Sequence, residues 1–113
     1  MSDIISESNS ATNLLFTYGT LQDEQIQLSL FSRKLKDTKD ALANYKLSDK
    51  KVTDSYPTIR YTGNSIDILE GKVYVLTHKE LMLADSYEGI AYRRIEVVLM
   101  SGKKTWVYVE NEI

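Results

Sequence analysis

The run Leu14-Leu15-Phe16-Thr17-Tyr18, followed at once by Gly19-Thr20-Leu21, decides the fold of this 113-residue chain. Its apolar and aromatic residues, with one threonine, favour a buried β-strand. Gly19 marks the point where that strand breaks into a loop. Because the run is apolar almost throughout, we expect this strand to lie at the centre of its sheet.

The segment after this loop has the pattern of a helix. Polar residues 22–25 lead into Ile26, Leu30 and Phe31, whose spacing suits one helix face. Basic residues gather at the far end of the segment, where the helix dipole favours positive charge. We therefore expect a helix directly after the loop.

Short stretches that favour β-strands follow at 41–47, 57–61 and 66–76. The last of them contains Gly71, where we expect a bend or a bulge. Turn-forming residues separate the stretches at 48–51 and 62–65.

The C-terminal third begins with a helix signal. Thr77-His78-Lys79-Glu80 has the form of a capping box, and it predicts a short helix over 79–87. After Glu88-Gly89, the stretches 94–100 and 104–109 are separated by Ser-Gly-Lys. They predict a β-hairpin that closes the domain.

Several strands, at least two helices and no regular βαβ alternation indicate the α+β class. We expect a small sheet, mostly antiparallel or mixed and barrel-like, with flanking helices. Residues 1–11 are polar and are expected to form a flexible tail, which leaves 12–113 as a single domain.

Composition narrows the possible functions. A net charge of -2 gives no basic field for nucleic acid or anionic membranes, and no stretch is long and apolar enough to span a bilayer. The first ten residues lack the features of a secretory signal. We expect a cytoplasmic protein whose partners are neither nucleic acid nor membrane.

The residue inventory excludes several chemistries. With no cysteine and one histidine, the chain offers no thiolate nucleophile, no thiolate zinc site and little basis for a serine triad. We interpret His78 as a surface residue of a first helical turn. Asp37 and Asp40 have the spacing of a pair but lie among lysines, in an expected solvated turn. Carboxylates or tyrosines must carry any catalysis, and no cofactor or metal is indicated.

The loop Tyr18-Gly19-Thr20-Leu21 is the first candidate site. A glycine there can adopt positive φ, and successive N–H groups near a helix start can hold an anion such as a carboxylate. The alternative is a plain turn from strand to helix, with Thr20 as the N-cap.

The second candidate site is Glu88, just after the predicted helix 79–87. Tyr87 and Ile90 would partly bury its carboxylate, and burial raises a carboxyl pKa toward values useful for proton transfer. The alternative is a solvated acid at a helix end, paired with Arg93 or Arg94.

These segments together resemble the gamma-glutamyl cyclotransferase-like superfamily. The resemblance is carried in order by five pieces of sequence, from about residue 14 to residue 109: Leu14 to Leu21 with its Tyr-Gly-Thr-Leu signature, Tyr56-Pro57-Thr58-Ile59, Glu70-Gly71-Lys72-Val73-Tyr74, Leu81 to Arg94 with Asp-Ser-Tyr-Glu-Gly, and Trp106-Val107-Tyr108-Val109. Each piece alone is weak, but five in the right order make chance agreement improbable.

The resemblance implies a pocket where the loop meets the glutamate. Tyr18, Gly19, Thr20 and Leu21 would bind the carboxylate of a small gamma-glutamyl substrate, Glu88 would be the acid/base, and Tyr108 would contribute a hydroxyl. The implied reaction releases 5-oxoproline and a free amine without a cofactor. Backbone donors near Gly19 or the Tyr108 hydroxyl would stabilise the oxyanion. The alternative is a protein of the same fold that binds a small ligand without turnover.

Overall fold

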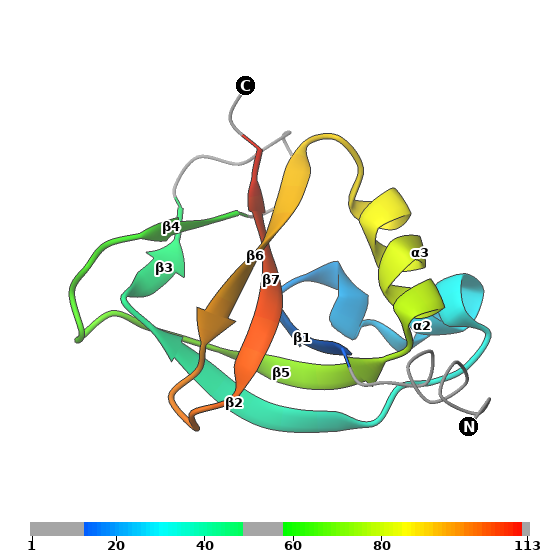
Figure 1. Cartoon of the computed structure of the whole chain (residues 1–113), viewed down its shortest axis with the longest axis horizontal. Coiled ribbons are helices and arrows are strands. Elements are labelled where there is room, and N and C mark those ends of the chain that lie inside the picture. The colour runs from blue at the N-terminus through cyan, green and yellow to red at the C-terminus, as the bar shows by residue number, and fades with distance from the viewer. Residues whose placement is uncertain (1–12, 49–57, 112–113) are drawn as a thin grey trace, which may run out of the picture.

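The structure is a computed structural model that describes residues 13–48 and 58–111, and Figure 1 shows the path of the chain. Seven strands and three helical segments form in the described part of the chain. Their bounds, in chain order, are β1 (Asn13–Thr17), the 3-10 helix η1 (Thr20–Gln22), α2 (Glu24–Phe31), β2 (Asp37–Ala43), β3 (Tyr45–Leu47), β4 (Ile59–Tyr61), β5 (Ile68–Leu76), α3 (His78–Glu88), β6 (Tyr92–Val98) and β7 (Lys104–Glu110).

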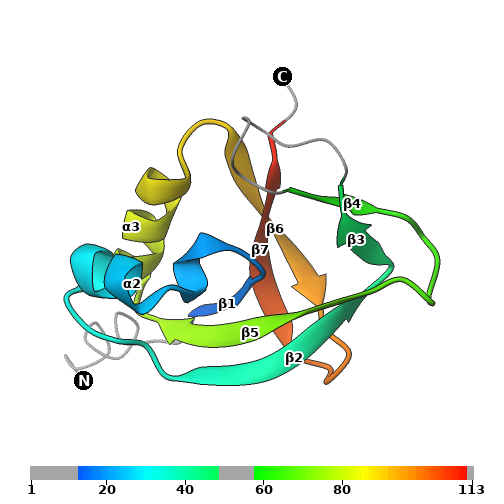
Figure 2. The same cartoon turned by 180° about the vertical axis from the view of Figure 1, so that it is seen from behind.

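Five of the strands form one mixed sheet in the order β2-β5-β1-β7-β6. β1 pairs antiparallel with β5 and parallel with β7, while the β2–β5 and β6–β7 pairs are antiparallel. The prediction that the first strand is central is therefore confirmed. Figures 1 and 2 show β6 and β7 crossing β5 and β2 at a steep angle, so the sheet is strongly twisted.

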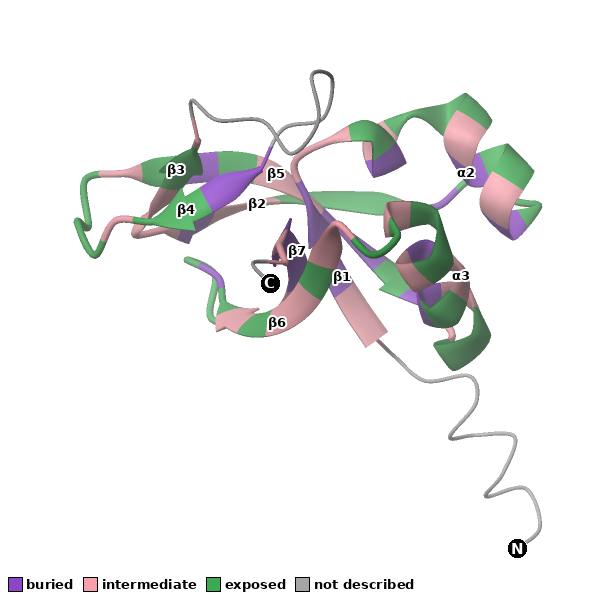
Figure 3. Ribbon diagram, turned by 90° about the horizontal axis from the view of Figure 1, so that it is seen from above, coloured by how far each residue is buried: buried purple, intermediate pink, exposed green. Residues whose placement is uncertain are grey.

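The alternation of side chains along β1 divides the core in two. Leu15 belongs to the cluster between the sheet and the helices, together with Leu81 and Ala84 of α3. Phe16 points to the other face and packs in a second cluster with Val107 and Ile59. Figure 3 shows the buried residues concentrated along β1 and on the inner sides of the helices. Both faces of the central strand are thus covered.

The two α-helices lie side by side at one end of the sheet, in both views of Figures 1 and 2. The predicted capping box is confirmed: the Thr77 hydroxyl accepts from the Glu80 N–H at 3.1 Å, and the Glu80 carboxylate accepts from the Thr77 N–H at 3.0 Å. His78 is exposed in the first turn of α3, as predicted. At 8 and 11 residues, both helices fall well short of the roughly 20 needed to cross a membrane.

Two details of the strand prediction are wrong. Asp37 and Asp40 lie in the edge strand β2, whose first three residues are all exposed, and not in a turn. The stretch 41–47 divides between β2 and β3, because Asn44 takes a left-handed conformation with φ 74° and turns the chain into a separate two-stranded sheet with β4.

The predicted bulge at Gly71 is also wrong. The register runs unbroken through β5, with Gly71 opposite Asp40 and Lys72 opposite Thr17. Glycine is required here because a Cβ would lie 2.7 Å from the Phe16 ring carbon Cζ and would also meet the Thr17 carbonyl oxygen. The glycine therefore marks a close approach of β5 to the end of β1.

The α+β class, with a mixed sheet and flanking helices, is confirmed. The C-terminal hairpin of β6 and β7 is also confirmed. The predicted tail 1–11, the turn residues 49–51 and the Tyr56-Pro57 segment lie outside the described residues. The extent of the single domain, 12–113, stays a prediction.

Candidate active site

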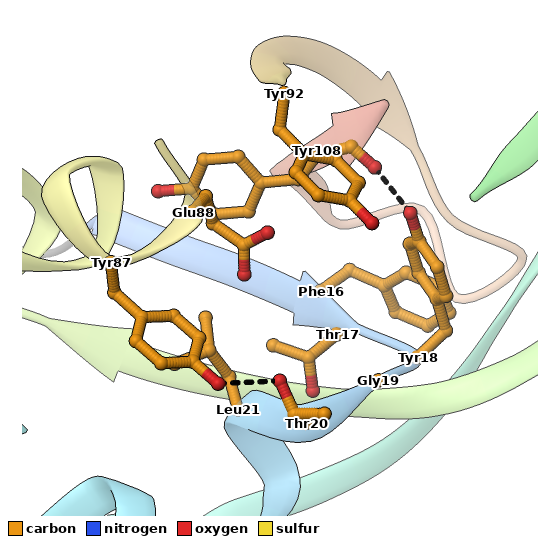
Figure 4. A pocket seen from close by; sticks show the side chains of 10 residues that line it. All are labelled: Phe16, Thr17, Tyr18, Gly19, Thr20, Leu21, Tyr87, Glu88, Tyr92 and Tyr108. Atoms are coloured by element: carbon orange, nitrogen blue, oxygen red, sulfur yellow. Dashed lines mark hydrogen bonds between the residues drawn. The ribbon is translucent and has the colours of Figure 1, made fainter. Parts of the chain in front are cut away.

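A cavity of about 140 Å³ opens between the end of β1, the end of α3 and the strands β6 and β7 (Figure 4). It is smaller than the usual range for drug-sized ligands, so it suits a compact molecule or one end of a longer one. Its lining includes every residue predicted for the site and four more: Tyr18, Gly19, Thr20, Leu21, Glu88 and Tyr108, with Phe16, Thr17, Tyr87 and Tyr92. Segments 90 residues apart in sequence meet here.

The loop after β1 forms one wall of the cavity. Gly19 has φ −135°, so the expected positive φ is not found, and the chain turns instead by entering η1. The first N–H groups of such a helix have no partners within it. Within the described residues, no hydrogen bond uses the N–H groups of Thr20 or Leu21. Two backbone donors are therefore available to a ligand.

Side-chain hydrogen bonds fix this wall. Thr20 is not the N-cap of α2, since Asp23 accepts from the N–H groups of Gln25 and Ile26 instead. The Thr20 hydroxyl bonds to the Tyr87 hydroxyl at 2.8 Å, which joins the loop to α3 (Figure 4).

Two glutamines support the same wall from behind. Gln27, only 2% exposed, donates to the Leu21 carbonyl oxygen at 2.8 Å and accepts from the Leu35 N–H at 2.9 Å. Gln22 donates to the Thr17 carbonyl oxygen at 2.8 Å. The Thr17 hydroxyl is buried and has no hydrogen-bond partner within the described ranges 13–48 and 58–111.

Glu88 ends α3, and Gly89 follows it with φ 77° as the C-cap. The Glu88 side chain points into the cavity toward the loop (Figure 4). Burial and, secondly, the negative charge of Asp85 raise the pKa of the Glu88 carboxyl from 4.5 to about 7. The alternative of an ion pair with Arg93 or Arg94 is wrong: among the described residues no ion pair joins Glu88 to either arginine, and Arg94 bonds to Asp85. At neutral pH both protonation states of Glu88 are populated.

Tyr18 and Tyr108 form the third side of the cavity. The Tyr18 hydroxyl donates to the Tyr108 carbonyl oxygen at 2.7 Å, and the Tyr108 hydroxyl donates to Asp85 Oδ1 at 2.7 Å. Burial raises the pKa of both phenols well above its ordinary range, so both stay protonated. The side chains of these tyrosines line the cavity, but their protons are committed elsewhere.

Sequence reasoning did not assign a role to Asp85 or Tyr92, and it expected of Tyr87 only that its ring would help to bury the Glu88 carboxylate. Asp85 and Glu88 are three residues apart, and the structure extends α3 to Glu88, one residue beyond the predicted helix 79–87, which places both residues on one face. No comparable signal identifies Tyr92, because it reaches the cavity through the pairing of β6 with β7. No group of three or more His, Asp or Glu side chains within 13–48 and 58–111 is placed to hold a metal ion.

Solved structures share this fold. A solution structure of an Arabidopsis thaliana protein has a TM-score of 0.75 and 26% identity, over 92% of this chain and 65% of that protein. A structure described as a gamma-glutamyl cyclotransferase has a TM-score of 0.68 and 24% identity, over 90% of this chain and 68% of that one. An uncharacterised human protein has a TM-score of 0.63 and 23% identity, over 89% and 68%. The chain thus spans about two-thirds of the length of these proteins.

No curated protein matches the sequence. The family model described as gamma-glutamyl cyclotransferase, AIG2-like, matches residues 15–112, which include the whole of the cavity lining. The chain belongs to the gamma-glutamyl cyclotransferase, AIG2-like family.

Proposed function

We propose that the protein converts a gamma-glutamyl amine or peptide to 5-oxoproline and a free amine. The observation that carries the proposal is the Glu88 carboxylate, which faces a small cavity with a pKa near 7, opposite a loop with free backbone donors. A carboxyl with that pKa can both remove and return a proton at neutral pH. Membership of the family supports the same reaction.

The loop binds the substrate α-carboxylate in this proposal. The N–H groups of Thr20 and Leu21 lie at the start of η1 and have no partner among the described residues, so they can donate to an anion. With the carboxylate held there, the rest of the gamma-glutamyl group extends toward Glu88.

The chemical step is an intramolecular acyl transfer. Glu88 takes a proton from the substrate α-ammonium, and the amine nitrogen then attacks the gamma-carbonyl carbon to close a five-membered ring. As the tetrahedral intermediate breaks its bond to the original amine, Glu88 gives its proton to that nitrogen. The attacking nitrogen also passes its second proton to the departing amine, which leaves as an ammonium. One C–N bond forms and one breaks, and Glu88 returns to the carboxylate, so no co-reactant is needed.

The cavity contributes mainly by orientation. Nucleophile and electrophile belong to one molecule, so the binding wall has to hold the folded conformer in which they meet. Such orientation can lower a barrier by on the order of 7 to 11 kcal/mol. The rigid support of the loop by Gln22 and Gln27 suits this task.

The test is release of 5-oxoproline from a panel of gamma-glutamyl amines, gamma-glutamyl dipeptides and glutathione. The proposal predicts product with wild-type protein for at least one class, and a rate at least about a hundredfold lower with Glu88→Gln. Glu96→Gln is the matched control, because Glu96 pairs with Lys104 outside the cavity and its change should leave turnover intact. Folded wild-type protein that releases no product from any class would contradict the proposal and favour ligand binding without turnover.

A further inference from the structure

The carboxylate of Asp85 is held beside the cavity from two sides. Arg94 donates from Nε to Oδ1 at 2.6 Å and from Nη2 to Oδ2 at 2.9 Å. The guanidinium of Arg94 also lies over the Trp106 ring, 4.4 Å from its centroid. Hydrogen bonds from Arg94 and Tyr108 outweigh burial and hold the pKa of Asp85 below its ordinary value. Asp85 is therefore a fixed, ionised acceptor.

The Tyr108 hydroxyl has a single proton, and that proton lies on the bond to Asp85 Oδ1 at 2.7 Å. A bond to a carboxylate is roughly twice as strong as a bond between neutral groups. A neutral ligand oxygen cannot compete for this proton. What Tyr108 Oη can offer to the cavity is a lone pair.

We propose that Asp85, clamped by Arg94, is a positioning residue that keeps the Tyr108 hydroxyl as a hydrogen-bond acceptor in the pocket. The group that suits such an oxygen is an N–H donor, and in a gamma-glutamyl substrate this is the α-ammonium. The inference rests on the proposed function and sharpens it. It places the α-ammonium between Tyr108 and Glu88, and it removes the Tyr108 hydroxyl as a donor to the oxyanion.

The same arrangement sets the charge around Glu88. Asp85 and Glu88 are three residues apart on α3, on one side of the helix. The titratable groups that line the cavity with Glu88 are Tyr87 of α3, Tyr92 of β6, Tyr108 of β7 and Tyr18, which follows β1. The charged groups Asp85 of α3 and Arg93 and Arg94 of β6 line the neighbouring cavity, and of these Asp85 acts on the Glu88 pKa. Asp85 is the one anion in this set, and Arg94 is its counter-charge.

A double-mutant cycle on kcat/KM for 5-oxoproline release tests the inference. Asp85→Asn retains shape but removes the negative charge that holds the Tyr108 proton, which frees that proton to turn toward the cavity. We expect kcat/KM to fall roughly tenfold to a hundredfold. Tyr108→Phe should cost about tenfold in wild type and less than about twofold in the Asp85→Asn protein, because the two residues act as a unit. Additive losses would overturn the inference.

Two further readouts separate positioning from simple stability. Asp85→Asn should move the rising limb of the pH–rate profile to lower pH, because an anion near Glu88 is lost. Arg94→Gln should move it to higher pH, because the counter-charge is lost. Shifts in the same direction, or none, would overturn the inference. Asp37→Asn is the matched control, since Asp37 also has an ion-pair partner, Lys72 at 3.5 Å, but lies outside the cavity lining.

The ¹³Cζ resonance of Tyr108 reports on the hydrogen bond without turnover. It is assigned by its absence in Tyr108→Phe, and it should shift in Asp85→Asn but not in Asp37→Asn. If wild-type protein releases no 5-oxoproline but the resonance still shifts in Asp85→Asn, the Asp85–Tyr108 arrangement is upheld while the proposed function fails. An unchanged resonance would overturn the inference whatever the turnover.

Discussion

The two walls of the cavity differ in what they offer a ligand. The wall built from the end of β1 and η1 presents donors, the N–H groups of Thr20 and Leu21. The wall built from α3 and β7 presents acceptors, the Glu88 carboxylate and the oxygen of Tyr108. A molecule with a carboxylate at one end and an ammonium a few bonds away satisfies both walls. The contrast supports an amino-acid head group as the ligand and divides the work between binding and proton transfer.

The largest effect on turnover is expected for the acceptor wall, which is the wall built from α3 and β7. Glu88→Gln should lower kcat by about 10² to 10⁴, the usual contribution of a general acid/base, and should change KM little. Steady-state kinetics on the best substrate of the panel would measure both constants. A large rise in KM with an unchanged kcat would assign Glu88 to binding. It would contradict the division of the cavity into a wall that binds the ligand and a wall that transfers protons.

The donor wall, built from the end of β1 and η1, depends on the close approach of β5 to β1 at Gly71. Gly71→Ala places a methyl group against the Phe16 ring and the Thr17 carbonyl, so we expect a loss of about 3 kcal/mol or more in the free energy of unfolding. Denaturant unfolding would measure the loss. Gly102→Ala is the control, because an added methyl group there meets open space. We expect it to lower the free energy of unfolding by only about 1 kcal/mol, since alanine disfavours the φ of 94° at this position. Equal losses in the two variants would contradict the close approach.

The raised pKa of Glu88 also affects stability. A carboxyl whose pKa rises on folding stabilises the folded state fully below pH 4.5, and this contribution is lost as pH rises toward about 7. At pH 8 the buried charge therefore costs at most roughly 3 kcal/mol. Glu88→Gln should be more stable than wild type at pH 8, and the difference should shrink toward pH 5. Thermal unfolding across this range would check it, and a difference that grows toward low pH would contradict it.

The smallest effect concerns a single donor. Proline fits the first position of a 3-10 helix, so Thr20→Pro should remove one N–H with little change in backbone shape. We expect KM to rise about tenfold to a hundredfold with kcat nearly unchanged, because a hydrogen bond to a charged group contributes roughly 1.5 to 3 kcal/mol.

Thr20→Val is the control for this change. It retains the N–H and loses the hydroxyl bond to Tyr87, so KM should change far less than in Thr20→Pro. Equal rises in KM for the two variants would show that the hydroxyl, and not the backbone, holds the carboxylate.

The sequence predicted the central strand, the capping box and the hairpin because each depends on local chemistry that a few neighbouring residues carry. It placed Asp37 and Asp40 in a turn because an edge strand exposed to water has the same polar composition as a loop. The position of Glu88 beside the loop came from a family resemblance, since no local pattern joins residues 70 positions apart. The bonds of Asp85 to Arg94 and Tyr108 escaped prediction, because they depend on how α3 packs against β6 and β7.

The most direct test of the proposed reaction is the pH dependence of kcat/KM for 5-oxoproline release between pH 5 and 9. The Glu88 carboxylate has to be ionised to accept the substrate proton, so the rate should rise with pH through a midpoint near 7. A rate that does not change across this range would contradict proton transfer by Glu88.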